Sequence, residues 1–324
     1  MFNVRNTDKR LRNKSFIDLF CGIGGFHLAL SSYGAKCVFA SDINVAASNV
    51  YYENFRIHPK GDIKCIKNID IPKHDILCAG FPCQPFSISG NQNGFSDEDG
   101  KLFFEVYRIA RYHKPKLIIL ENVKNLLSHN NGNTIAVMEQ KLNSIGYDTY
   151  KEVLCATDFS VPQARKRVYI VAFRNDLNVQ NFDFPSSKGR LKVVSDILEN
   201  NVEQKYFITN SYIINGDITN DQNKYDKLMR IGSVGLGRQG ERIYSVRGQG
   251  ITLSSQGGGV GGKTGMYYVD GGVRKLTPRE CARMMGFPER FRLANTDAEC
   301  YKQFGNSVVV NVIQEIIGEA SKYL

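Results

Sequence analysis

The sequence predicts an α/β protein: a sheet of parallel strands flanked by helices, with a smaller domain of short strands and glycine-rich loops. Three observations support this. Short apolar runs alternate with helical patterns in the first half, glycine is concentrated between residues 231 and 272, and an apolar segment lies near the C-terminus. Strands that alternate with helices are typical of parallel sheets joined by helical crossovers.

The first half supplies the elements of the predicted sheet. Apolar, β-rich runs predict strands at 16–20, 37–40, 75–79, 117–120 and 168–173. Helical patterns predict a helix that ends near Tyr33 and two more at 102–112 and 134–142. These helices are placed to connect successive parallel strands.

The second half has a different composition. Residues 231–272 contain 14 glycines in 42 positions, which excludes an ordinary helix and predicts loops with short strands such as 242–246. A helix is predicted to begin at Thr277, because Thr caps it, Pro278 fits its first turn and Glu280 completes a capping box. The apolar segment 308–317 is expected to pack against the first half.

The length of the chain indicates how these elements are grouped. Domains usually hold about 150 residues, so a chain of 324 residues predicts two domains. We expect a large domain formed by 1–190 together with 304–324, a smaller domain at 191–275, and a connecting segment at 276–303.

Positive charge is concentrated in the second half. The net charge is +10, and residues 224–302 hold 14 Lys and Arg against 7 Asp and Glu. A concentrated basic stretch is typical of a polyanion binder. An ordinary solvated basic surface is the alternative.

Several classes of protein are not predicted. No apolar run is long enough to cross a membrane, and Asp18 interrupts the apolar stretch that follows the basic N-terminus, so neither a membrane span nor a secretory signal is expected. The eight cysteines form no CxxC pair and no HExxH motif occurs, so no metal site is expected. Scattered cysteines favour a reduced, cytoplasmic protein.

A glycine-rich turn follows the first predicted strand. The segment Asp18-Leu-Phe-Cys-Gly22-Ile-Gly-Gly25 leads from a strand into a helix, as in nucleotide-type pockets. His27 stands where a dinucleotide fingerprint has its third glycine, which disfavours NAD. Asp42 lies 20 residues after Gly22 and is placed to bind ribose hydroxyls, and Asp62 is a candidate contact for an adenine amino group. A purely structural turn is the alternative.

Two further motifs follow predicted strands directly. Cys83 stands in Gly80-Phe-Pro-Cys-Gln-Pro-Phe-Ser87, where prolines on both sides stiffen the loop. Glu121 stands in Glu-Asn-Val after the next strand. The carboxyl ends of parallel strands meet at the ligand-binding edge of a sheet. Cys83 is therefore a candidate nucleophile and Glu121 a candidate proton donor. A buried small hydrophobe and a helix cap are the alternatives.

A third motif precedes the last predicted strand of the first half. Arg165 and Arg167 have i, i+2 spacing in Gln163-Ala-Arg-Lys-Arg, so on a strand both would point to one face. Two guanidinium groups on one face suit a phosphate, a base carbonyl or a thiolate. A solvated strand entry is the alternative.

Taken together, these motifs resemble the DNA (cytosine-5)-methyltransferase family, and within it the HhaI type. The matching segments are DLFCGIGG at 18–25, Asp42, GDI at 61–63, PCQ at 82–84, ENV at 121–123, QARKR at 163–167, RKLTPRECARMMGFP at 274–288 and QFGNSVVVNV at 303–312. The match is in order along the chain, and the PCQ segment followed by ENV is highly specific.

The resemblance implies a fold and a cofactor site. The fold is a class I methyltransferase fold, with a Rossmann-like mixed sheet flanked by helices, that binds S-adenosyl-L-methionine (SAM), together with a smaller target-recognition domain. It implies catalytic roles for Cys83 as nucleophile, Glu121 as partner of the cytosine ring and Arg165 as a support for the base. The implied SAM-binding residues are Phe20, Gly22, Ile23, Gly25, Asp42, Ile43, Asp62, Ile63, Pro82, Leu102, Asn306 and Ser307.

The resemblance also implies a substrate. A monomer would methylate C5 of a cytosine flipped out of double-stranded DNA, most simply as the modification enzyme of a restriction system whose endonuclease acts separately on the same site. The segment 239–252 suggests the target GCGC. The candidate DNA contacts are Ser89, Arg167, Gln239, Arg242, Tyr244 and Thr252.

Three other functions are weighed against this one. A catalytically dead homologue that only binds DNA is disfavoured by the intact Cys83, Glu121 and Arg165. An RNA methyltransferase with the same fold is disfavoured by the basic glycine-rich region. A Rossmann oxidoreductase is disfavoured by His27.

Overall fold

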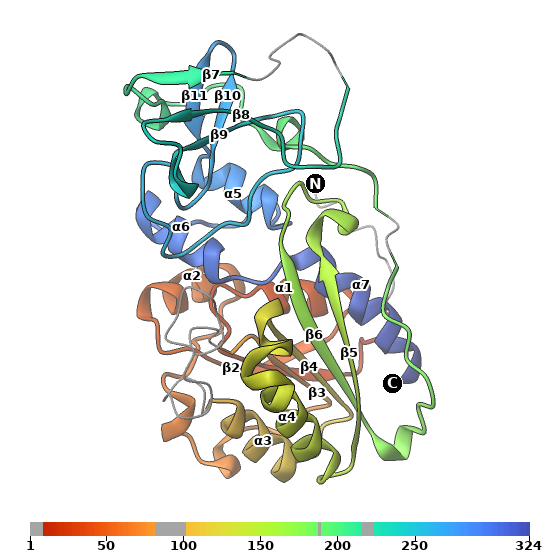
Figure 1. Cartoon of the computed structure of the whole chain (residues 1–324). Helices are drawn as coiled ribbons and strands as arrows, with labels where there is room; N and C mark the ends of the chain where they lie inside the picture. Colours follow the sequence, from red (N-terminus) through yellow and green to blue (C-terminus); the bar gives the residue numbers. More distant parts are fainter. Residues whose placement is uncertain (1–8, 82–101, 187–188, 216–222) are drawn as a thin grey trace. The chain divides into compact units, whose positions relative to one another are not determined.

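The structure is a computed structural model that describes residues 9–81, 102–186, 189–215 and 223–324. The chain forms two compact units (Figure 1). Unit 1 comprises 1–154, 166–185 and 312–324, and unit 2 comprises 155–165 and 186–311. The predicted limits of the two domains and of the connecting segment remain a prediction.

Unit 1 is built on a six-stranded sheet with the strand order β2-β1-β3-β4-β6-β5. The strands are β1 (Ser15–Leu19), β2 (Lys36–Ser41), β3 (Ile76–Ala79), β4 (Leu117–Val123), β5 (Tyr147–Cys155) and β6 (Lys166–Arg174). All pairings from β2 to β4 are parallel, whereas β6 runs antiparallel to β4. The five predicted strands are confirmed, and the sheet is mixed, as the resemblance implies. The sequence did not predict β5.

Helices cover the sheet of unit 1 because its strands are apolar on both faces. The helices are α1 (Gly25–Ser32), α2 (Val45–Phe55), α3 (Leu102–His113), α4 (Asn133–Asn143) and α7 (Val310–Ala320), whose residues from Val312 belong to unit 1. Helices α3 and α4 lie on one face of the sheet (Figure 1). Their buried side chains pack with every second residue of the strands, such as Leu77 and Ile118. The intervening residues, among them Asp18 and Cys78, therefore point to the opposite face.

The C-terminal helix packs into unit 1, as the apolar segment 308–317 predicts. Ile313, Ile316 and Ile317 of α7 are fully buried. The Gln314 side chain donates a hydrogen bond to the Ser32 hydroxyl of α1 at 3.1 Å. The last helix of the chain is thus part of the same unit as the first strand.

Unit 2 contains a five-stranded sheet with the order β11-β10-β9-β8-β7. The strands are β7 (Tyr212–Ile214), β8 (Arg230–Val234), β9 (Arg242–Ser245), β10 (Met266–Val269) and β11 (Gly272–Lys275), and the helices are α5 (Pro278–Met284) and α6 (Asp297–Asn306). The predicted start of α5 is confirmed: Thr277 is its N-cap and forms a capping box with Glu280.

Glycines let backbone segments of unit 2 touch directly. A Cβ at Gly257 would lie 1.7 Å from the Gly262 carbonyl oxygen, and one at Gly240 would lie 2.1 Å from that of Gly258. No other residue fits such contacts, so the glycine content reflects packing of loop on loop. In the described parts of the chain, no helix has the length and apolar character needed to span a bilayer.

Candidate active site

The turn after β1 adopts a conformation that its glycines permit. Phe20, Gly22 and Gly24 have φ angles of 56°, 51° and 89°. Only glycine adopts this left-handed region without strain. A Cβ at Gly22 would meet no atom within 4 Å, so the turn borders open space. The turn therefore leaves room for a ligand to approach its backbone.

Asp42 fixes this turn from the end of β2. One carboxylate oxygen accepts from the Gly22 backbone N–H at 2.7 Å, and the other accepts from the Asn44 N–H at 2.8 Å. Burial raises the pKa of Asp42, while these two hydrogen bonds act in the opposite direction. Each oxygen keeps a further lone pair. Asp42 is thus committed to shaping the turn and still able to accept from a ligand hydroxyl.

The loop that carries Asp62 is attached next to Asp42. The Asp42 N–H donates to the Lys60 carbonyl oxygen at 3.1 Å, which ties the segment before Asp62 to the end of β2. Ile43 is 73% exposed, whereas Ile63 is buried. An exposed apolar side chain between two acidic residues suits a flat heterocycle that carries polar groups at its edge.

Asp18 is a buried carboxyl group below the turn. Its side chain has no exposed surface, and no hydrogen bond of normal geometry reaches either oxygen from the described residues. Burial raises its pKa well above the usual range, the charge of Asp42 adds to the shift, and the backbone N–H of His27 opposes it. A positively charged ligand beside this turn would stabilise the ionised forms of both acids. The sequence motif contains Asp18. That its carboxyl group is buried without a hydrogen bond of normal geometry from the described residues is known only from the structure.

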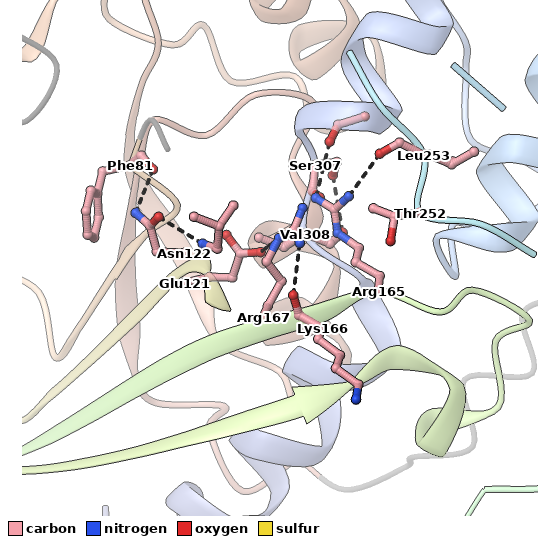
Figure 2. Close-up of polar contacts among 12 residues, drawn as sticks. Phe81, Glu121, Asn122, Arg165, Lys166, Arg167, Thr252, Leu253, Ser307 and Val308 are labelled. Atoms are coloured by element: carbon pink, nitrogen blue, oxygen red, sulfur yellow. Dashed lines mark hydrogen bonds and ion pairs between the residues drawn. The ribbon is translucent and has the colours of Figure 1, made fainter. Parts of the chain in front are cut away.

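Glu121 lies within β4, near its carboxyl end, and not after the strand as predicted, because β4 extends to Val123. Its neighbour Asn122 contacts the segment that leads to Cys83. Asn122 donates from its side chain to the Phe81 carbonyl oxygen at 3.2 Å and accepts from the Val123 N–H at 2.8 Å (Figure 2). Asn122 is buried, so this link is protected from solvent. Phe81 is the last described residue before Pro82, and Pro82, Cys83 and Ser89 lie outside the described residues. Sequence reasoning did not assign this role to Asn122.

Glu121 forms an ion pair with Arg167. The Arg167 Nε lies 3.2 Å from Glu121 Oε1, and the two side chains are 16% and 10% exposed (Figure 2). The register explains the contact: β4 and β6 are antiparallel, Val123 faces Arg167, and Glu121 is therefore its diagonal neighbour on the same face. A guanidinium group thus lies beside the candidate acid.

Arg165 lies elsewhere. It precedes β6, which begins at Lys166, and it belongs to unit 2. Its side chain is buried and donates to the carbonyl oxygens of Leu253, Gly305 and Ser307 at 3.3, 3.2 and 2.9 Å (Figure 2). The expectation that Arg165 and Arg167 share one face of a strand is wrong, because the strand starts between them. Arg165 ties three backbone segments of unit 2 together.

The remaining cofactor candidates divide between the two units. Ile23 and Gly25 are buried beside the turn, and Leu102 is buried at the start of α3. Asn306 is exposed at the end of α6, and Ser307 is buried and accepts from Arg165. The structure therefore gathers the turn residues Phe20, Gly22, Ile23 and Gly25 with Asp42 and Ile43 at the carboxyl ends of β1 and β2. It leaves Asn306 and Ser307 with the other unit.

The candidate DNA contacts of unit 2 have different surroundings. Gln239 is exposed in the 3₁₀ helix Gln239–Glu241. Arg242 begins β9, and its buried Nε has no hydrogen-bond partner among the described residues. Tyr244 is buried, with its ring centroid 6.1 Å from that of Tyr267. Thr252 donates to the Ala164 carbonyl oxygen at 2.7 Å. Gln239 and Arg242 thus retain most capacity for a partner.

Among the described residues, no three His, Cys, Asp or Glu side chains are arranged to hold a metal ion.

Comparisons with known proteins place this chain in a family. The model of the C-5 cytosine-specific DNA methylases matches residues 14–322. The type II methyltransferase M.HhaI of Haemophilus parahaemolyticus is 49% identical over 309 residues, which cover 95% of this chain and 94% of that protein. The type II methyltransferase M.HaeII of Haemophilus aegyptius is 41% identical over 93% of this chain and 91% of its own length.

Solved structures agree on the fold. The methyltransferase EhMeth of Entamoeba histolytica has a TM-score of 0.75 at 20% identity, covering 94% of this chain and 97% of that one. A putative DNA modification methyltransferase encoded within an E. coli prophage has a TM-score of 0.72 at 20% identity, covering 95% and 99%. These likenesses support the mixed α/β fold of the class I methyltransferases. From the family model and the identity to M.HhaI, we conclude that the chain belongs to the C-5 cytosine-specific DNA methylase family and is a DNA cytosine-5-methyltransferase.

Proposed function

We propose that this enzyme transfers a methyl group from SAM to C5 of a cytosine in duplex DNA through a covalent bond between Cys83 and C6. One observation carries the proposal: Asn122 holds Phe81, two residues before Cys83, beside the strand end that presents Glu121. A thiol and a carboxyl group from adjoining strand ends suit the two sides of one pyrimidine ring.

The roles of the residues follow from the chemistry of cytosine. C5 is a weak nucleophile, so a thiolate of Cys83 that adds at C6 would turn the ring into an enamine with a reactive C5. Glu121 would hydrogen-bond N3 and the amino group and stabilise the charge that develops there. After C5 has gained the methyl group, a base removes the C5 proton, the C5–C6 double bond forms again and the thiolate leaves.

Arg167 is proposed to assist at Glu121. A guanidinium group 3.2 Å from the Glu121 carboxylate can orient it and can also bind the base or a neighbouring phosphate. Arg165, which the resemblance assigns to the base, would act through the three carbonyl oxygens that it holds in unit 2. We therefore propose that Arg167 contacts the base beside Glu121. Arg165 is proposed as a positioning residue that holds backbone segments of unit 2.

The described residues around the glycine turn fit SAM. The open space at Gly22, the exposed Ile43 and the acids Asp42 and Asp62 suit an adenosine group. The bound cofactor supplies an electrophilic methyl group on a sulfonium. The proposed cofactor residues of unit 1 are Phe20, Gly22, Ile23, Gly25, Asp42, Ile43, Asp62, Ile63, Pro82 and Leu102. Asn306 and Ser307, which belong to unit 2, stay proposed cofactor contacts.

The substrate is proposed to be GCGC in double-stranded DNA, read by Ser89, Gln239, Arg242, Tyr244 and Thr252. The cytosine must leave the stack to reach the site, at a cost of a few kcal/mol. The enzyme would serve as the modification half of a restriction system, beside a separate endonuclease. The type II names of its relatives support this role.

Transfer of label from methyl-labelled SAM tests the activity and the substrate together. We expect label in a duplex that contains GCGC, and none in a matched duplex with GGCC or in tRNA. Label in GGCC alone would overturn the proposed target, label in tRNA alone would overturn the DNA substrate, and no label in any cytosine-containing acceptor would favour a DNA-binding homologue without activity.

A duplex with 5-fluorocytosine at the target tests the covalent step. Fluorine cannot leave as a proton does, so the protein should remain bound to the DNA in a denaturing gel when SAM is present. Cys83→Ser should abolish the adduct and keep SAM affinity close to that of the wild type. If peptide mapping located the adduct at Cys78, the proposed role of Cys83 would be wrong.

A further inference from the structure

Unit 2 contains a hollow that the proposed methyl-transfer site does not use. Its volume is about 380 Å³, and residues from four segments line it. We call it the lysine pocket and define it by its charged and aromatic members: Lys205, Tyr206, Lys263, Lys275, Asp297 and Tyr301. Gly257, Gly259, Val260, Thr264 and Ala298 complete the lining.

One lysine of the pocket is already engaged in ion pairs. The Lys205 Nζ lies 3.3 Å from Glu203 Oε1 and 3.5 Å from Asp297 Oδ2. Asp297 is the pocket's one acidic lining residue and also interacts with Tyr206, whose pKa burial and this carboxylate raise to about 12. The acidic charge in the pocket is therefore balanced by Lys205.

The other two lysines have no acidic partner. Lys263 and Lys275 are half-buried, and neither forms an ion pair with any described residue. The Tyr301 hydroxyl donates to the Leu276 carbonyl oxygen at 2.7 Å, so it is not free to act on a ligand as a donor. The lining of the pocket thus includes two lysines that form no ion pair with a described carboxylate.

We propose that the lysine pocket binds a phosphate group, namely a backbone phosphodiester of duplex DNA, without regard to base sequence. Lysine ammonium groups bind phosphate as point charges and read no base edge. The pocket lies within the unit that carries 14 basic and 7 acidic residues between 224 and 302, a field that attracts DNA before specific contacts form. The choice of DNA as the source of the phosphate rests on the proposed function, whereas the phosphate chemistry does not.

Salt dependence of DNA binding tests the pocket directly. The probe is a fluorescent duplex that lacks GCGC, and affinity is measured by anisotropy over a series of KCl concentrations. Each phosphate contact contributes about 0.9 to the slope of log K against log salt concentration. We expect the variant Lys263→Gln with Lys275→Gln to lower the magnitude of that slope by about 1, and Lys263→Arg with Lys275→Arg to restore it.

A charge-matched control shows whether a change in the salt slope comes from the lysine pocket or from the loss of any two positive charges. Lys302 is exposed on α6 outside the pocket, and Lys322 is an exposed lysine near the C-terminus. Lys302→Gln with Lys322→Gln removes the same two charges and should leave the slope near that of the wild type. Equal slopes for wild type, pocket variant and control would overturn the proposal, provided that the melting temperatures show all three to be folded. An unfolded Gln variant would move the test to lysine acetylation mapping of the wild type, in which DNA should protect Lys263 and Lys275.

Inorganic pyrophosphate distinguishes the source of the phosphate. If it raises the melting temperature of the wild type but not of the pocket variant, while the DNA slope stays unchanged, the pocket takes a free phosphate compound and the assignment to DNA is wrong. Methyl transfer to the GCGC duplex, measured at low salt on the same proteins, is a separate readout. Loss of transfer by the wild type would overturn the proposed function without altering the salt slopes.

Discussion

Two carboxylate–guanidinium pairs, one in each unit, show how similar chemistry supports different tasks. In unit 2, Glu280 has no exposed surface and receives four donors: two from Arg274 at 2.7 and 2.8 Å, and the backbone N–H groups of Thr277 and Glu199 at 2.8 Å each. In unit 1, Glu121 meets Arg167 at 3.2 Å and borders solvent. A carboxylate with four donors is committed to the fold, whereas Glu121 lies near the carboxyl end of its strand, where sheets of this type bind ligands. The first pair therefore serves the fold, and the second is the one we propose for the reaction.

The largest effect is expected from breaking the buried pair. Arg274→Met leaves the Glu280 charge buried without its main partner, which should reduce the free energy of unfolding by about 3–5 kcal/mol. Urea denaturation measures this loss. Replacing both partners, Arg274→Met with Glu280→Leu, should recover part of it, because the isolated charge is then gone. A stable single variant would show that Glu280 is not held as a carboxylate by Arg274.

The pair in unit 1 should respond mainly in activity. Glu121→Gln keeps the shape of the side chain but removes its charge and its ability to give a proton, so kcat for methyl transfer should fall by about 100-fold or more. Its free energy of unfolding should fall by less than that of Arg274→Met, because the amide oxygen can still interact with the Arg167 guanidinium group. A variant with full activity would show that Glu121 takes no part in methyl transfer. A variant that unfolds would show that the Glu121–Arg167 pair stabilises the fold, as the Glu280–Arg274 pair does.

The two arginines of the segment 163–167 allow the same comparison of stability with activity, with smaller expected effects. Arg165→Lys loses bonds to three buried carbonyl oxygens, so it should destabilise the protein by about 1–3 kcal/mol. Arg167→Lys keeps the charge but not the planar group beside Glu121, so it should lower kcat/KM by about tenfold, or about 1.4 kcal/mol, with little change in stability. If Arg165→Lys instead lowered kcat/KM and Arg167→Lys lowered stability, Arg165 would be the arginine that contacts the base.

These arginines also show where sequence reasoning reaches its limit. The motif and its basic character are readable, but the role of each arginine depends on a strand that begins at Lys166, and strand limits are the least certain part of a sequence-based prediction. The strands β1, β3 and β4 were predictable because each is a short buried apolar run. The strand β5 was not, because most of its residues between Asp148 and Val153 are exposed or half-buried and polar.

The loops of unit 2 were predictable only in kind. Fourteen glycines between 231 and 272 predict irregular backbone, but the contacts that require them, such as Gly257 on Gly262, join backbone atoms that leave no pattern in the sequence. The same holds for the Glu280 site. Its capping box with Thr277 follows from the spacing, whereas its partner Arg274 lies on β11 and is found only in the structure.

The last comparison tests the turn at the unit 1 site. Gly22 and Gly146 both have positive φ, at 51° and 90°, and a Cβ at either position would meet no atom within 4 Å. Gly22→Ala and Gly146→Ala should therefore each cost about 1–2 kcal/mol through backbone strain alone, which thermal melts can compare. The two should differ in SAM affinity measured by calorimetry: Gly22→Ala places a methyl group in the open space of the proposed pocket and should weaken binding, whereas Gly146, which follows α4, should leave it unchanged. Equal SAM affinities for the two variants would show that SAM does not bind at this turn, whatever the stabilities of the variants.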